Sequence, residues 1–139
     1  MVSGILQGYF FWLQRVLHPR SYGYRPRIFE GVRAFAGGKK LGTSGYLAQP
    51  TVLVDTHPKM KVVQEEIFGP VVVATPFTDP EEVLSAANQS VYGLAAAVWT
   101  RDLPKAHMFA ARVKAGTVWI NCYNVFDAAL PFGGYKQSG

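Results

Sequence analysis

The sequence of 139 residues is poor in several features, and each shortage excludes a class of protein. Its only cysteine is Cys122, so the chain cannot form an internal disulfide, and no cluster of Cys and His suggests a metal site. This favours a reducing compartment, which we take to be the cytoplasm. The longest apolar run near the start, Tyr9 to Leu13, is too short to cross a bilayer, so we expect no membrane anchor.

Acidic residues are also scarce, at 9 against 14 basic ones, which gives a formal net charge of +5. Residues 1–29 carry +4 of this charge and no acidic side chain, so residues 30–139 carry only +1. A nucleic-acid face needs basic residues gathered on the folded part of a chain. We therefore expect no nucleic-acid partner, although a nucleic-acid-binding peptide formed by residues 1–29 stays an alternative.

The chain divides near Glu30. Before it, glycine and proline interrupt every periodic pattern, and only a short helix over Ile5–Leu17 can be suggested. An acid-free start with arginines is typical of transit peptides, but this one is poor in serine and rich in aromatic residues, which does not favour a targeting signal. We treat residues 1–29 as an unassigned basic and aromatic segment.

From residue 30 onward the patterns become regular. Asp79 before Pro80, and Asp102 before Pro104, each predict the start of a helix. Apolar runs predict strands over residues 32–36, 46–54, 71–77, 94–100 and 117–122. The alternation over residues 71–122 predicts an α/β fold with a βαβαβ unit and a parallel sheet covered by helices. Ligands are expected beyond the carboxyl ends of such strands, where residues 121–126 and 132–135 follow the last one.

Glycine is missing from the first strand-to-helix turn of this unit, Thr78-Asp79-Pro80. A dinucleotide-binding half needs glycines there, because backbone amides must approach the pyrophosphate closely. The carboxylate of Asp79 would in addition repel a phosphate. This unit is therefore not expected to hold the phosphates of a dinucleotide.

Four blocks resemble the aldehyde dehydrogenase superfamily, in the correct order and at plausible spacing. They are the segment Gln64-Glu65-Glu66-Ile67-Phe68-Gly69-Pro70-Val71, Asn88 with Tyr92-Gly93-Leu94, the segment from Ala115 to Asn121, and the segment from Pro131 to Gly139. By this resemblance residues 30–139 are similar to the C-terminal part of that family's Rossmann-like catalytic domain. The family is expected to form homo-oligomers.

The resemblance implies an oxidoreductase that converts an aldehyde to a carboxylate with NAD or NADP. The carboxylate matching Glu66 binds the nicotinamide-ribose hydroxyls, which suits an ionised acceptor. An aromatic ring at Phe68 covers a flat apolar face, and Leu94 also lies near the nicotinamide. The residues matching the substrate tunnel are Asn124, Phe126 and Phe132.

The resemblance also implies what is missing. The family's nucleophilic cysteine, its general-base glutamate and its glycine-bearing cofactor domain all lie upstream of the Glu66 block, and none has a counterpart here. We therefore expect no catalytic residue in this chain, and a fragment that is inactive alone. As an alternative, the chain is a non-catalytic partner that associates with full-length dehydrogenase subunits.

Several candidate residues also have plainer interpretations. Cys122 could be a nucleophile, but it ends a buried strand and reads better as a small buried hydrophobe. Glu65 and Glu66 point to opposite sides if the segment is extended, so one is expected to be solvated. Phe126 and Phe132 could be core residues, although a loop position favours a site. His107 is expected to be solvated.

Overall fold

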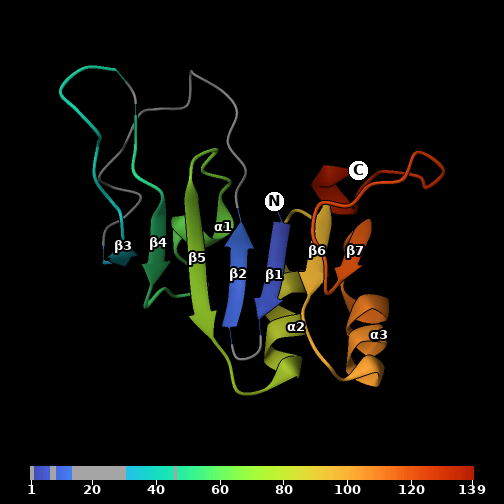
Figure 1. The fold of residues 1–139 in the computed structure, drawn as a ribbon. Helices are drawn as coiled ribbons and strands as arrows, with labels where there is room; N and C mark the ends of the chain where they lie inside the picture. Colours follow the sequence, from blue (N-terminus) through green and yellow to red (C-terminus); the bar gives the residue numbers. More distant parts are fainter. Residues whose placement is uncertain (1, 7–8, 14–30, 46) are drawn as a thin grey trace.

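The structure, a computed structural model, describes residues 2–6, 9–13, 31–45 and 47–139, the first two ranges by their backbone alone. Its strands form one sheet in the order β3-β4-β5-β2-β1-β6-β7 (Figure 1). The strands are β1 Val2–Leu6, β2 Tyr9–Leu13, β3 Arg33–Ala36, β4 Thr51–Val54, β5 Val71–Pro76, β6 Ala95–Val98 and β7 Thr117–Ile120. The helices are α1 Lys61–Gln64, α2 Pro80–Gln89 and α3 Leu103–Arg112, followed by the 3-10 turn η2 Lys136–Ser138.

The two longer helices begin where the sequence predicts. The carboxylate of Asp79 accepts a hydrogen bond from the amide of Glu81 at 2.9 Å, and Pro80 follows as the first residue of α2. The carboxylate of Asp102 accepts one from the amide of Lys105 at 3.0 Å at the start of α3. These caps are local interactions between a side chain and its own next turn, so the sequence is sufficient to place them. Both predictions are confirmed.

The α/β fold and the order β5-α2-β6-α3-β7 are also confirmed, but the sheet is mixed rather than parallel throughout. The β6 and β7 strands pair in parallel, as do β4 and β5. Between β5 and β6 lies an antiparallel hairpin, in which β2 pairs antiparallel with β5 and β1 pairs in parallel with β6. The connection from β5 through α2 to β6 therefore passes over two strands, β2 and β1.

The helix suggested over Ile5–Leu17 is wrong as far as the structure describes it. Residues 5–6 and 9–13 lie in β1 and β2, and residues 14–17 lie outside the described ranges. The run Tyr9-Phe10-Phe11-Trp12 consists of residues that favour strands. Pairing with β5 on one side and with β6 on the other stabilises the strand hairpin more than the weak helical spacing of these residues favours a helix. The register joins Phe11 to Gly4 on one side and to Ala74 on the other.

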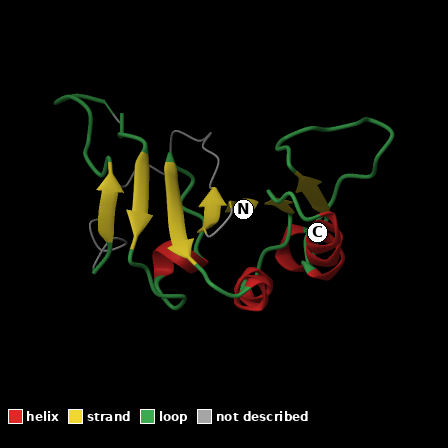
Figure 2. Cartoon of the chain, turned by 60° about the horizontal axis from the view of Figure 1, so that its bottom comes forward, coloured by secondary structure: helices red, strands yellow, loops and turns green. Residues whose placement is uncertain are grey.

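The helices cover one face of the sheet, and the long segment after β7 lies on the opposite face (Figure 2). Alternate residues of β6 divide between the two faces, as the pleat of a strand requires. Ala96 and Val98 join the larger core beneath the helices, whereas Ala95 and Ala97 pack with Trp119 on the other face. All four residues of β6 are buried, as suits its continuous apolar run. Within the described residues, no helix is long and apolar enough to cross a membrane.

Candidate functional site

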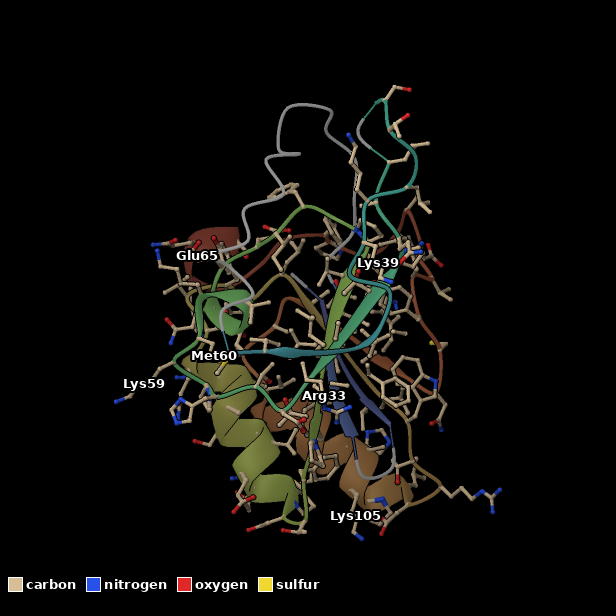
Figure 3. The ribbon with its side chains drawn as sticks, turned by 90° about the vertical axis from the view of Figure 1, so that its left-hand side faces the viewer. Arg33, Lys39, Lys59, Met60, Glu65 and Lys105 are labelled. Atoms are coloured by element: carbon tan, nitrogen blue, oxygen red, sulfur yellow. The ribbon has the colours of Figure 1, made fainter. Side chains whose placement is uncertain are left out.

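Glu66 and Phe68 lie on the short connection between α1 and β5. Glu65 is exposed and Glu66 is half-buried, so the two carboxylates differ in solvation as expected. Phe68 has a positive φ of 52° and keeps 44% of its surface exposed. A bulky residue in the left-handed region is strained, and strain of this kind collects at functional sites. The connection enters β5 at its amino end, where Figure 3 labels Glu65. This is the opposite end of the molecule from Lys105, at the start of α3.

A second group of candidates lies on the sheet face opposite the helices. The ring of Phe126 packs edge-on against Trp119, with centroids 5.5 Å apart, and against Phe132, with centroids 5.4 Å apart. We call Trp119, Phe126 and Phe132 the aromatic group. Trp119 is only 7% exposed, whereas Phe126 and Phe132 are 56% and 59% exposed. Two candidate tunnel residues therefore touch each other and present apolar surface to solvent.

The remaining two candidates flank this group. Asn124 is exposed and has a positive φ of 60°, which asparagine tolerates better than most residues. Leu94 precedes β6 and packs against the small cluster that contains Trp119. Leu94 is therefore close to the aromatic group, on the same face of the sheet.

The C-terminal block, residues 131–139, returns to the amino ends of β6 and β7 (Figure 1). The amide of Tyr135 donates to the carbonyl of Gly93 at 2.9 Å, and the amide of Gly93 donates to the Ser138 hydroxyl at 3.2 Å. A Cβ on Gly116 would lie 1.8 Å from the carbonyl oxygen of Gly133, so only glycine permits this approach. The family blocks around residues 93, 116 and 133–138 thus form one structural junction.

Lys136 closes this junction against the end of α2. Its ammonium donates to the carbonyl oxygens of Asn88 at 2.8 Å and Ser90 at 2.5 Å, which are groups that a helix end leaves without a partner. Burial lowers the pKa of Lys136 below its ordinary value, and the nearby ammonium of Lys114 lowers it further. The contact positions the C-terminal block and gives no sign of acid–base chemistry.

Asn88 and Glu81 join α2 to α3. The Asn88 amide donates to the carbonyl of Arg112 at 3.0 Å and accepts from the amide of Lys114 at 2.7 Å. The guanidinium of Arg112 makes two hydrogen bonds to the carboxylate of Glu81, at 2.5 and 2.6 Å. This pair lowers the pKa of Glu81 and raises that of Arg112. Asn88, one of the residues that carries the resemblance, therefore has a structural role.

The two groups of candidates are attached to different parts of the sheet. Glu66 and Phe68 lead into β5, whereas the aromatic group belongs to β7 and the segment after it. Two strands separate β5 from β6, which places β5 and β6 about 14 Å apart at the usual strand spacing. The structure brings Phe126 and Phe132 together and places Leu94 against the cluster that contains Trp119, whereas Glu66 and Phe68 lead into β5, across the hairpin.

The carboxyl-end rule holds for only part of the site. Residues 121–124 follow β7 at its carboxyl end, but Gly133, Gly134 and Tyr135 contact the residues that precede β6 and β7. The reason is the length of the segment after β7, which recrosses the open face before it docks on Gly93. Residues 132–135 are therefore corrected to the amino end of the sheet.

Cys122 is exposed, which corrects the expectation of a buried cysteine. Asn121, with a φ of 54°, turns the chain out of the ladder one residue earlier, so the apolar run ends before Cys122. The Asn121 amide holds this turn, accepting from the amide of Thr100 at 2.8 Å and donating to its carbonyl at 2.9 Å. His107 is exposed, as expected.

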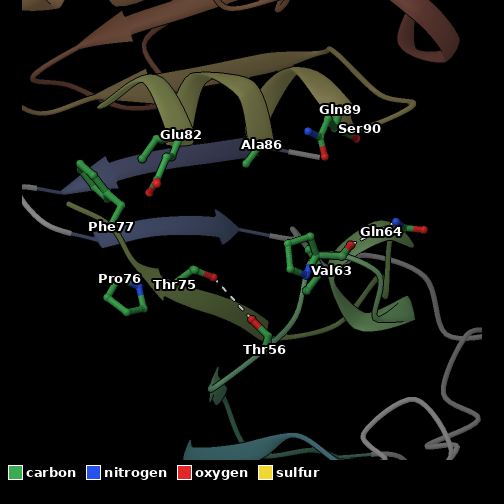
Figure 4. A pocket seen from close by; sticks show the side chains of 12 residues that line it. Thr56, Val63, Gln64, Thr75, Pro76, Phe77, Glu82, Ala86, Gln89 and Ser90 are labelled. Carbon is green, nitrogen blue, oxygen red and sulfur yellow. Dashed lines mark hydrogen bonds between the residues drawn. The ribbon is translucent and has the colours of Figure 1, made fainter. Parts of the chain in front are cut away.

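A cavity of about 280 Å³ lies on the helix face, and none of the candidate residues lines it (Figure 4). Thr56 and Thr75 lie side by side on one wall of it, with hydroxyl oxygens 3.4 Å apart, and α2 contributes Val83 and Ala86. The Gln64 amide at its rim already donates to the carbonyl of Pro58. None of the residues that line it matches a family site position, and we assign no ligand to it.

Sequence reasoning missed two residues that shape the site. Trp119 was noted only as part of a strand, although its indole nitrogen donates to the carbonyl of Val125 at 2.7 Å and so fixes the segment that carries Phe126. Asn121 falls in a family block and in the segment expected beyond the last strand, but no role for its side chain follows from the sequence. A buried indole just before a loop is a signal for such a contact, since its N–H needs an acceptor. The acceptor itself could not be named from sequence.

Comparison with known proteins agrees with these features. Residues 25–139 match the model of the aldehyde dehydrogenase family. An aldehyde dehydrogenase of Agaricus bisporus is 54% identical over 110 residues, which are 79% of this chain and 22% of that protein. The human mitochondrial aldehyde dehydrogenase is 52% identical over 110 residues, which are 79% of this chain and 21% of that protein.

Solved structures give the same picture. An aldehyde dehydrogenase from Bacillus cereus, in complex with NAD+, superposes with a TM-score of 0.77 and 51% identity over 85% of this chain and 24% of its own. One from Mycobacterium tuberculosis, also with NAD+, superposes with a TM-score of 0.77 and 45% identity over 86% of this chain and 25% of its own. The chain thus spans about a fifth to a quarter of the length of these relatives. With most of its residues matched in sequence and in fold, it belongs to the aldehyde dehydrogenase family.

Proposed function

We propose that this chain contributes part of the pocket of an aldehyde dehydrogenase that oxidises an aldehyde to a carboxylate with NAD+ or NADP+. Residues 30–139 act as part of the catalytic domain. Glu66 accepts the hydroxyls of the nicotinamide ribose, and Phe68 and Leu94 flank the nicotinamide. Asn124, Phe126 and Phe132 form the wall against the aldehyde. Two relatives from B. cereus and M. tuberculosis are described as NAD+ complexes, which supports the choice of cofactor.

The backbone of Phe68 is the observation that carries the proposal. A phenylalanine at φ 52° costs of the order of 1–2 kcal/mol relative to an ordinary conformation. It does not repay this by burial, because 44% of the residue stays exposed. A strained, exposed ring beside a half-buried carboxylate fits a flat ligand that carries hydroxyl groups.

The residues of this chain bind and orient the reactants. The nicotinamide, when bound, supplies the hydride acceptor. An ionised Glu66 accepts two hydroxyl hydrogen bonds at once, which fixes the ribose. The exposed faces of Phe126 and Phe132 exclude water from the aldehyde and disfavour a charged carboxylate product. The attacking thiolate and the general base are not among these residues, so we expect binding without turnover.

Titration with nicotinamide mononucleotide tests the cofactor half of the proposal, because this ligand consists of the parts that Glu66, Phe68 and Leu94 are proposed to bind. We expect weak binding, with a Kd of about 1 mM or above. Glu66→Gln keeps the shape and removes the charge, and should weaken binding about tenfold, the value of one hydrogen bond to a charged group. NMR chemical shifts of the ligand and of the Phe68 ring report the binding.

Glu65→Gln is the matched control, since it makes the same change one residue away on an exposed side chain. It should leave the affinity unchanged. Equal losses for both variants would show a nonspecific effect of charge, and binding that survives Glu66→Gln and Phe68→Ala together would refute the site.

A second candidate function rests on the position of β7. This strand pairs with β6 and ends the sheet, so one of its edges is open among the described strands. An open edge can receive a strand of another chain. The chain would then act as a non-catalytic partner of full-length dehydrogenase subunits. Co-purification with a full-length dehydrogenase favours this function, and a monodisperse, stable monomer in its presence counts against it.

A further inference from the structure

The segment between β7 and the C-terminal block is fixed at both ends. At its start, the amide of Asn121 donates to the carbonyl of Val98 at 2.8 Å, and its side chain bonds the backbone of Thr100 in both directions. At its end, Tyr135 is bonded to Gly93. Both anchors belong to the two ends of β6, so the segment crosses the open face of the sheet between them.

Trp119 holds the middle of this segment. Its ring is buried among Ala95, Ala97 and Leu94, and its indole N–H donates to the carbonyl of Val125 at 2.7 Å. Val125 itself is 62% exposed. The short bond therefore ties an exposed loop to a side chain of the core, one residue before Phe126 and one residue after Asn124.

The exposed rings take their orientation from the same tryptophan. Phe126 stands at 87° to the Trp119 ring, and Phe132 stands at 74° to the ring of Phe126. Edge-to-face pairs have a preferred geometry, so each ring limits the rotation of the next. Trp119 thus acts on Phe126 twice, through the ring contact and through the backbone of Val125.

We propose that Trp119 is a positioning residue that sets the shape of the aldehyde wall and favours flat aromatic aldehydes over flexible aliphatic ones. This inference rests on the proposed function, since it assumes that Phe126 and Phe132 contact the aldehyde. Edge-to-face contacts hold the exposed face of each ring in a fixed orientation, and a planar ring stacks on such a face without losing internal freedom. A flexible chain must give up rotamer freedom to use the same surface.

Trp119→Phe tests the inference, because it keeps a ring in the core and removes the N–H donor. The probes are benzamide and hexanamide, unreactive carbonyl analogues of an aromatic and an aliphatic aldehyde, titrated into the full chain by NMR. The wild type should prefer benzamide. In Trp119→Phe the preference should fall by up to about fivefold, the value of the one hydrogen bond that fixes the loop, and the ring protons of Phe126 should shift. A purely structural role would weaken both probes alike and leave their ratio unchanged.

Trp99→Phe is the matched control, since Trp99 packs against the same small cluster but belongs to no candidate site. It should leave the ratio unchanged. If the wild type binds benzamide and Trp119→Phe keeps the preference, the inference is overturned while the proposed function stands. If the wild type binds neither probe, the proposed role of Phe126 and Phe132 as the aldehyde wall is rejected. Unshifted Phe126 resonances in Trp119→Phe would reject the positioning role of Trp119 independently.

Discussion

The approach of the C-terminal block to Gly116 gives the sharpest prediction of stability. In Gly116→Ala the new Cβ would lie 1.8 Å from the carbonyl oxygen of Gly133, so the block must move away by more than an ångström. That movement breaks three hydrogen bonds that tie residues 135, 137 and 138 to the start of β6. At about 1 kcal/mol each, their loss should lower the free energy of unfolding by about 2–4 kcal/mol.

Gly133→Ala is the control, because nothing lies within 4 Å of its Cβ position and its φ is not in the left-handed region. Its effect should stay within about 0.5 kcal/mol. Urea denaturation followed by tryptophan fluorescence measures both variants, and hydrogen exchange at the amide of Tyr135 shows whether the block has lifted. Equal midpoints for the two variants would refute the packing argument.

Three further changes test other parts of the fold. Asn88→Ala should cost about 2 kcal/mol, because it removes two hydrogen bonds between α2 and the end of α3, whereas Gln89→Ala should cost little; thermal melts compare them. Phe11→Pro removes a backbone donor from the middle of β2 and should destabilise the sheet by about 1–3 kcal/mol, read by urea midpoint; an unchanged midpoint would contradict the hairpin's place in the ladder. Because the pKa of Glu81 is lowered in the folded state, its pair with Arg112 stabilises the fold at pH values above the ordinary pKa of 4.5. This stabilisation is lost as the pH falls below that value. Glu81→Gln should therefore flatten the decline in stability at acid pH, measured by urea midpoints across pH.

Local rules predicted the folded part of the chain well. Asp79 and Asp102 cap their helices through atoms two or three residues away, so no distant information is needed. The apolar run over residues 95–98 is buried because the helix-side core packs on one face of the strand and Trp119 packs on the other. The same rules failed for residues 5–6 and 9–13, because the choice between helix and strand there depends on β5 and β6, which come some sixty to ninety residues later in the chain.

The sequence named candidate residues for the site, but it could not give their arrangement in space. The contact between Phe126 and Phe132 depends on a loop that recrosses the sheet, and no periodic pattern encodes that path. The exposure of Cys122 depends on one backbone angle, at Asn121. The placing of Glu66 and Phe68 across the hairpin from the aromatic group depends on which strands lie between β5 and β6.

We propose above that this chain binds the reactants of an aldehyde dehydrogenase without supplying the attacking sulfur. Absorbance at 340 nm, recorded with the purified chain, an aldehyde and NAD+ or NADP+, tests it most directly. We expect no formation of the reduced cofactor, in a sample that still binds nicotinamide mononucleotide. Steady formation of the reduced cofactor that disappears in Cys122→Ala would contradict it.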